Sequence, residues 1–119
     1  MRSLADACVA LVAALHAGFL VLEMFLWDTP RGRRIFGLTR EFARSTRALA
    51  ANQGLYNGFL AAGLAWGLAL GAAGDAVKIF FLACVIVAGV FGALTANVRI
   101  LWVQALPGAA ALALVLAAG

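Results

Sequence analysis

Charged residues are scarce in this chain: they make up 12% of its 119 residues, against 66% hydrophobic residues. Soluble domains carry about a quarter charged residues, and a chain this short buries too small a fraction of its surface to hide so much apolar area from water. The composition therefore excludes an ordinary water-soluble domain and predicts an integral membrane protein. A length typical of one domain, without a break in composition, predicts a single domain over residues 1–119.

Metal ligands and catalytic motifs are equally scarce. The chain has two cysteines, Cys8 and Cys84, each inside an apolar run, and a single histidine, His16. Two cysteines so far apart form no metal-ligand pattern and are weak evidence for a disulfide, and one histidine with one glutamate is too few for a metal site. No nucleophile–base pair, phosphate-binding loop or dinucleotide-binding pattern is present. We therefore expect no metal and no cofactor.

Positive charge is concentrated in one segment. Six arginines against two carboxylates give residues 28–47 a net charge of +4, which equals the net charge of the whole chain. The remaining three cations and three anions cancel. A basic loop beside apolar runs is typical of a membrane surface, so we expect membrane lipids as partners and no nucleic acid. The arginines are Arg31, Arg33, Arg34, Arg40, Arg44 and Arg47, and the residues that cancel are Arg2, Lys78 and Arg99 against Asp6, Glu23 and Asp75.

Four apolar stretches are long enough to cross a bilayer, which takes about 20 helical residues. They lie at about 5–27, 49–71, 77–97 and 100–118. The sequence thus predicts an all-α, polytopic four-helix transmembrane bundle with a basic cytoplasmic first loop. No small-residue cleavage site ends the first stretch, so we expect a retained helix there and not a signal peptide.

Local signals place the ends of these stretches. Trp27 is predicted to be an interfacial anchor, and Pro30 to end the first helix. Thr39 is expected to cap a short helix with Glu41 in its first turn, an amphipathic segment at the headgroup level that runs into the second span. Lys78, at the start of the third span, is expected to snorkel to the membrane surface.

The distribution of arginine and lysine predicts the orientation. Cytoplasmic loops carry an excess of these residues, and here the first loop has six arginines and the turn at 97–99 has Arg99. The turn at 71–76 has only Lys78 at its edge. We therefore expect an inner (plasma) membrane protein with the first loop in the cytoplasm and both termini outside, although Arg2 weakly opposes this.

Small residues recur at four-residue spacing on two faces of the second span. Such spacing lets helix backbones approach closely in lipid, so this helix is predicted to pack on both sides. Four short helices leave little room for a large cavity within one chain, which also favours a homodimer formed through small-residue faces. The two sets are Gly54, Gly58 and Ala62, and Gly63, Gly67 and Gly71.

Polar residues inside the predicted spans gather toward the cytoplasmic side. At a rise of about 1.5 Å per residue, Glu23 lies ~6 Å deep and His16 ~16 Å deep, and their seven-residue separation puts them on one helix face. Intramembrane ionisable residues indicate a functional site. The alternatives are a structural partner of nearby arginines for Glu23, and an interhelical hydrogen bond for His16. The predicted ligand-binding residues are His16, Glu23, Asn52, Gln53, Asn57 and Gln104, with Arg31, Arg33 and Arg34 holding an anionic headgroup.

Two blocks of the sequence resemble a known family. They contain LEMFLW at 22–27 with TPRGRRIFGL at 29–38, and ANQGLYNGFLAAG at 51–63. The chain resembles, over its whole length, the domain of unknown function 1304 family of small integral membrane proteins. The resemblance implies a four-helix membrane protein and supplies no activity.

Three functions remain open at this point. The favoured one is binding or transport of a small amphipathic or lipid-like ligand through a cytoplasm-facing polar pocket. A second is a membrane enzyme acting on a lipid or isoprenoid substrate, with Glu23 and His16 as acid and base. A third is a structural membrane subunit without a site, whose small-residue faces pack against a larger partner.

Overall fold

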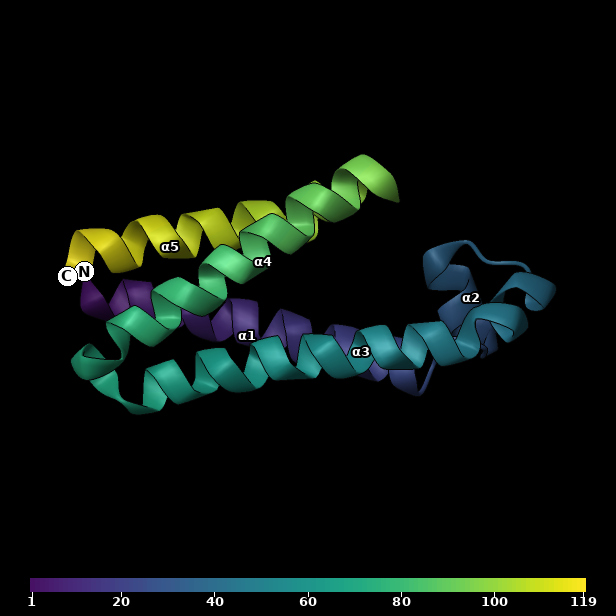
Figure 1. Cartoon of the computed structure of the whole chain (residues 1–119), viewed down its shortest axis with the longest axis horizontal. Coiled ribbons are helices and arrows are strands. Elements are labelled where there is room, and N and C mark those ends of the chain that lie inside the picture. The colour runs from purple at the N-terminus through teal and green to yellow at the C-terminus, as the bar shows by residue number, and fades with distance from the viewer. The chain divides into compact units, whose positions relative to one another are not determined.

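A computed structural model describes residues 1–119, and it consists of helices and the turns between them (Figure 1). The all-α prediction is confirmed. The elements in chain order are α1 (Arg2–Met24), α2 (Pro30–Phe36), α3 (Arg40–Ala69), the 3₁₀ turn η1 (Gly71–Gly74), α4 (Asp75–Thr95), the π-helical turn η2 (Leu101–Ala105) and α5 (Leu106–Ala118).

Three helical segments are long and apolar enough to cross a membrane: Arg2–Met24, Gly71–Thr95 and Leu101–Ala118. The remaining long helix, α3, has 30 residues, which corresponds to about 45 Å. It is less apolar than the others because its first turns carry arginines and its middle carries amides. Length and composition therefore support three of the four predicted spans directly.

The chain forms two compact units, and each has its own packing. The first unit comprises Met1–Ala14 and Leu60–Gly119, and the second comprises Leu15–Phe59. In the first unit the beginning of α1, the end of α3, α4 and α5 surround one apolar core. That core consists of Ala5, Val9, Val12, Leu64, Leu82, Val85, Ala111 and Val115.

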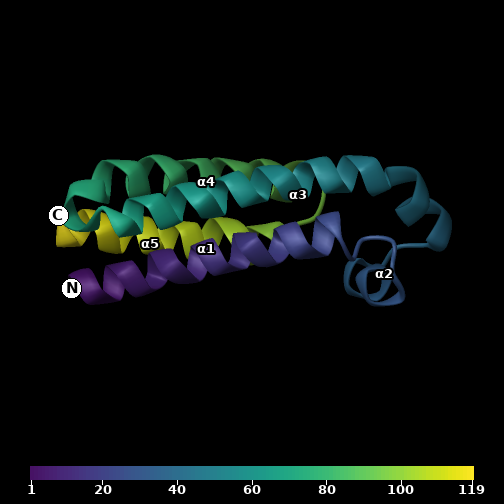
Figure 2. The same ribbon diagram turned by 90° about the horizontal axis from the view of Figure 1, so that it is seen from below.

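Close backbone approaches hold the helices of the first unit together. Figures 1 and 2 show α4 and α5 side by side, and a Cβ atom added at Gly89 would lie 2.6 Å from the backbone nitrogen of Ala105. A larger residue at Gly89 would therefore force the two elements apart. The π-turn precedes Pro107, whose ring cannot share space with the carbonyl four residues earlier. There the amide of Leu106 donates to the carbonyl of Leu101, which widens the turn.

The second unit turns at α2, a short helix that the sequence analysis did not anticipate. Thr29 caps it, accepting from the amide of Gly32 at 3.1 Å, Pro30 is its first residue, and Gly37 ends it at φ 66°. A threonine followed by proline is a start signal for a helix as well as a stop signal, so the residues that end the first helix also begin α2. The predicted cap at Thr39 is present: its hydroxyl accepts from the amide of Phe42 at 3.1 Å, and α3 then runs unbroken from Arg40 to Ala69.

Replacing Thr29 by alanine is expected to lower the free energy of unfolding by about 1 kcal/mol, the usual cost of losing an N-cap side chain. The change removes the bond to the Gly32 amide and a 2.6 Å bond to the Leu26 carbonyl. Hydrogen exchange at residues 30–36 should accelerate. Thr95→Ala is the control, because that hydroxyl bonds only within its own helix, to the Phe91 carbonyl. Equal exchange in both variants would show that Thr29 does not hold α2.

Candidate functional site

A carboxylate–amide pair joins α1 and α3 within the second unit. The side-chain amide of Asn57 donates to Oε1 of Glu23, and both side chains are half-buried. The helices meet here because position 54 is glycine: a Cβ added there would lie 2.7 Å from Cγ of Met24 and 3.1 Å from Cβ of Glu23. Two of the predicted site residues are therefore brought together. The small-residue spacing predicted close packing on this face of the helix, and Gly54 packs closely against α1.

The other predicted pocket residues have different surroundings. His16 is fully buried, with its ring 5.1 Å from that of Phe19 in an edge-on arrangement. Asn52 and Gln53 are exposed on α3. Gln104 is half-buried in η2 and belongs to the first unit.

A small hollow lies beside Trp27, where the chain leaves α1. It has a volume of about 200 Å³. The indole N–H of Trp27 donates to the hydroxyl of Thr46 at 3.0 Å, and its ring lies 4.8 Å from that of Phe36. Trp27 is thus fixed between α2 and α3, and the hollow beside it has both apolar and polar walls. The lining residues are Met24, Phe25, Trp27, Asp28, Thr29 and Arg47.

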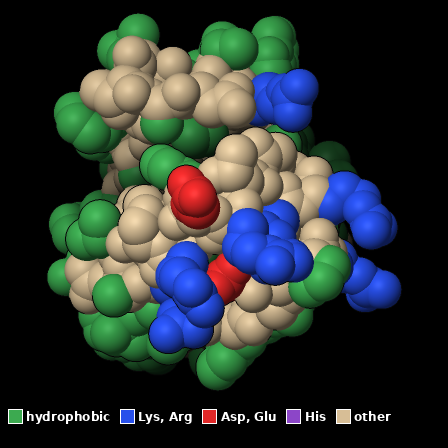
Figure 3. All heavy atoms as spheres, turned by 90° about the vertical axis from the view of Figure 1, so that its right-hand side faces the viewer, with side chains coloured by type: hydrophobic (Ala, Val, Ile, Leu, Met, Phe, Trp, Pro, Cys, Tyr) green, Lys and Arg blue, Asp and Glu red, His purple; other side chains and the backbone are tan.

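Most of the loop arginines point to the surface of the second unit. Arg33 is the exception, because it forms an ion pair with Asp28 at 3.0 Å and both side chains are largely buried. Lys and Arg side chains stand out in the space-filling view of Figure 3, with small patches of Asp or Glu among them. Asp28 is paired with Arg33, so Glu41 is the only other carboxylate of residues 28–47 against the five exposed arginines. We call these five residues the basic surface: Arg31, Arg34, Arg40, Arg44 and Arg47.

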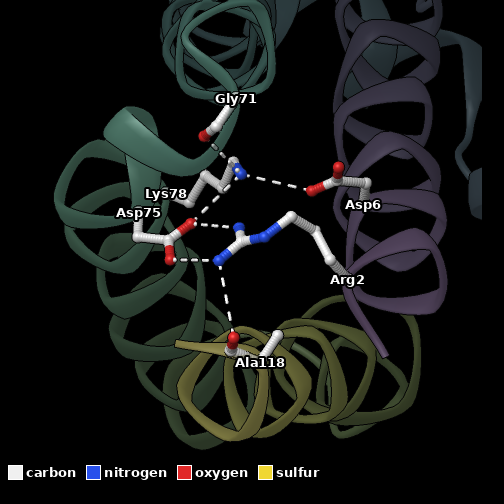
Figure 4. A network of polar contacts seen from close by, with 6 residues as sticks. All are labelled: Arg2, Asp6, Gly71, Asp75, Lys78 and Ala118. Atoms are coloured by element: carbon white, nitrogen blue, oxygen red, sulfur yellow. Dashed lines mark hydrogen bonds and ion pairs between the residues drawn. The ribbon is translucent and has the colours of Figure 1, made fainter.

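A second polar cluster, in the first unit, joins the start of α1, the start of α4 and the end of α5 (Figure 4). The guanidinium of Arg2 donates to both carboxylate oxygens of Asp75, at 2.9 and 3.1 Å, and to the carbonyl of Ala118 at 3.5 Å. The ammonium of Lys78 contacts Asp6 at 3.2 Å and Asp75 at 3.3 Å. It also donates to the carbonyl of Gly71 at 3.1 Å. Two cations and two anions therefore neutralise each other; we call Arg2, Asp6, Asp75 and Lys78 the charge cluster.

The snorkelling expected of Lys78 is wrong. Its side chain is 0% exposed, and its stem runs past Gly67, where an added Cβ would lie 2.8 Å from Cγ of Lys78. The ammonium turns inward because Asp6 and Asp75 supply acceptors that a snorkelling side chain would have to find in water. The signal was present in the sequence, since the predicted first and third spans begin on the same side of the membrane and carry these opposite charges at their starts.

Together these features define an all-helical protein with three helices fit to cross a membrane and a basic surface at a helical turn. The chain belongs to the DUF1304 family, described as a protein of unknown function, whose profile matches residues 10–116. It is 30% identical over 110 residues to the uncharacterised protein YpaA of Lactococcus lactis subsp. lactis, a match that covers 90% of this chain and 91% of that protein. No solved structure matches the chain. The resemblance seen in the two sequence blocks is thereby confirmed.

Proposed function

We propose that the protein is a four-span protein of the inner (plasma) membrane that binds an anionic, lipid-like amphiphile on the cytoplasmic side. The observation that carries this proposal is the basic surface, with its five exposed arginines, next to a hollow of about 200 Å³ lined by Trp27 and Arg47. An anionic headgroup needs cations that are not already paired, and an acyl chain needs an apolar wall. Met24 and Phe25 supply that wall, and Phe25 is 67% exposed.

The length of α3 supports the fourth span. At about 45 Å it exceeds the ~30 Å hydrocarbon core by several turns. If residues 49–69 cross the core, the arginine-bearing turns from Arg40 to Arg47 extend into the headgroup layer, where each cation gains about 1 kcal/mol from anionic lipids. Exposed apolar side chains among these arginines suit the same layer. They are Ile35, Phe36 and Phe42.

The sequence predicted that Arg31, Arg33 and Arg34 bind the anionic headgroup, and we propose one replacement in this set. Because Arg33 is held by Asp28, we assign it to fixing the turn at α2 and assign Arg47 to the ligand. Arg31 and Arg34 keep their predicted role. Glu23 and Asn57 form a polar contact within the same unit, and we propose that they, with the buried His16, order the helices that carry the hollow. Asn52 and Gln53 are exposed on α3 and keep their proposed role as ligand contacts.

Arg47→Gln is expected to weaken binding of phosphatidylglycerol by about tenfold or more, because Arg47 both lines the hollow and contributes to the surface potential. Arg44→Gln, three residues earlier on the same helix and outside the hollow, is the matched control. It should cost about fivefold at most, and high salt should abolish its effect, since exposed charges are screened. Native mass spectrometry of the detergent-released protein counts the bound lipids directly. Equal losses of lipid affinity in both variants would show that the basic surface attracts lipid by its charge and that the hollow is not a binding site.

The orientation has its own test. Ser45→Cys, in a chain whose two native cysteines are replaced by serine, places a thiol at an exposed position next to Arg44 of the basic surface. We expect this thiol to resist an impermeant maleimide added to intact cells and to react fully in inverted membrane vesicles, since arginine-rich loops stay in the cytoplasm. Labelling from outside would contradict the proposed topology, and it would also contradict ligand binding on the cytoplasmic side.

A further inference from the structure

The charge cluster of the first unit has no part in the lipid site proposed above, yet it places a fully buried ammonium inside a mostly apolar bundle. Buried ions are costly unless every proton has an acceptor. Lys78 meets this condition with Asp6, Asp75 and the carbonyl of Gly71. All three acceptors lie on different elements, namely α1, α4 and η1. The position of Lys78 therefore depends on the elements remaining together.

The same cluster holds the two ends of the chain. Arg2 bridges from the first residue of α1 to Asp75 at the start of α4, and to the carbonyl of Ala118 at the end of α5. Figure 4 shows the six residues converging from the three helices and the turn. Because one oxygen of Asp75 contacts both Arg2 and Lys78, this carboxylate is the shared counter-ion of two cations.

We propose that the charge cluster is an acid-sensitive clasp, which holds the starts of α1 and α4 and the end of α5 together and releases them when its carboxylates are protonated. Protonation removes the negative charge that separates the two cations. Lys78 would then be a buried ammonium next to Arg2 with neutral acceptors only, and it regains solvation by moving into water. That movement requires α1 and α4 to separate.

Besides the four members of the clasp, the charged groups near it are those of the chain ends: the α-amino group of Met1 directly precedes Arg2, and a Cβ added at Gly119 would lie 3.6 Å from Oδ2 of Asp75. No other charged side chain lies on the elements of the clasp. The elements packed at the clasp carry Arg2 and Asp6 on α1 and Asp75 and Lys78 on α4, whereas η1, α5 and the part of α3 in the first unit carry none. Arg99 lies in the turn at the opposite end of α4. The clasp is partly open to solvent, because the side chains of Asp6 and Asp75 are 38% and 21% exposed. Protons therefore reach its carboxylates while its lysine stays buried.

A native thiol reports the opening. Cys8 lies on α1 two residues after Asp6 and is half-buried against the core of the first unit. In a Cys84→Ala background, we would measure its reaction with 4,4′-dithiodipyridine in detergent, normalised to glutathione at each pH. The hydrogen-bonded guanidinium of Arg2 lowers the pKa of Asp75 to about 2, so this carboxylate is still ionised at mildly acidic pH. The normalised rate is therefore expected to rise about tenfold between about pH 7.5 and about pH 2, with the rise confined to pH values below about 4, as α1 separates from α4. Asp75→Asn should show the raised rate already at about pH 7.5.

Two further variants decide the outcome. Glu41→Gln removes an exposed carboxylate outside the clasp and should respond to pH as the parent does. The double variant Lys78→Met/Asp6→Asn removes the buried charge that would lose its counter-ion in acid. Its thiol should therefore react slowly at both the neutral and the acidic pH. This variant tests the proposal even if Asp75→Asn does not fold. A pH-independent parent rate would overturn the proposal. So would a Lys78→Met/Asp6→Asn rate that rises as much as the parent rate.

Discussion

Replacing Lys78 by alanine is expected to lower the free energy of unfolding by about 3 kcal/mol, the lower end of the range for removing one partner of a buried ion pair. The change deletes three contacts of the ammonium and leaves Asp6 without its cation. It also empties the space beside Gly67 that the lysine stem fills. The cost lies at the lower end of this range because Asp6 is 38% exposed, so its carboxylate regains some hydration when the lysine is removed.

Reversible unfolding in mixed detergent micelles, with SDS as the denaturant, measures this difference. Arg99→Ala is the control, because Arg99 is an exposed cation in the turn between α4 and α5 and should change the free energy by about 0.5 kcal/mol or less. Lys78→Met should be milder than Lys78→Ala, since methionine refills most of the lost volume. If Lys78→Ala and Arg99→Ala had equal effects, the buried ammonium would contribute nothing to the stability of the bundle.

Neutralising three arginines at once is expected to have the largest effect on ligand binding. In the Arg31→Gln/Arg34→Gln/Arg47→Gln variant, the affinity for phosphatidylglycerol should fall by about 100-fold, because each cation near an anionic layer contributes about 1 kcal/mol. Arg33 is left in place, since its pair with Asp28 fixes the α2 turn. Binding of zwitterionic phosphatidylcholine should not change.

Competition between the two lipids, followed by native mass spectrometry, separates the charge effect from a loss of structure. A variant that loses both lipids equally has lost its fold or its apolar wall, and the arginines would then not be the recognition element. The conservative Arg31→Lys/Arg34→Lys/Arg47→Lys variant is the control. It keeps the charge and should retain most of the selectivity at low salt, while losing the bidentate contacts of guanidinium groups to phosphate.

Composition and periodicity were enough to predict the helical class and much of its detail. The apolar stretches at 77–97 and 100–118 correspond to α4 and to η2 with α5, because long apolar runs without caps inside them leave few alternatives to a helix. Thr39 and Glu41 marked the start of α3 correctly. The glycines of α3 were also informative: Gly54 contacts α1 in the second unit, and Gly63 lies against Phe81 of α4 in the first.

The candidate sites were predicted less completely, and for a physical reason. The partners of Lys78 are Asp6 and Asp75, and Arg2 lies 73 residues before Asp75, so no local pattern connects them. Matching depths across the spans paired polar residues only at the predicted cytoplasmic end, although the same count at the other end would pair Asp6 with Lys78. Similarly, the pairing of Arg33 with Asp28 depends on the turn made by α2, where the sequence pattern predicts only the end of a helix.

Photo-crosslinking from the hollow tests the lipid site most directly. A p-benzoylphenylalanine at Phe25, which lines the hollow, is compared with the same residue at Phe91 of α4; both positions are 67% exposed. After irradiation in native membranes, mass spectrometry identifies the lipid attached to each. The proposed function requires that position 25 captures predominantly an anionic lipid, that position 91 captures lipids in proportion to their abundance, and that Arg47→Gln removes the difference. The same lipid distribution at both positions in the parent protein would contradict it.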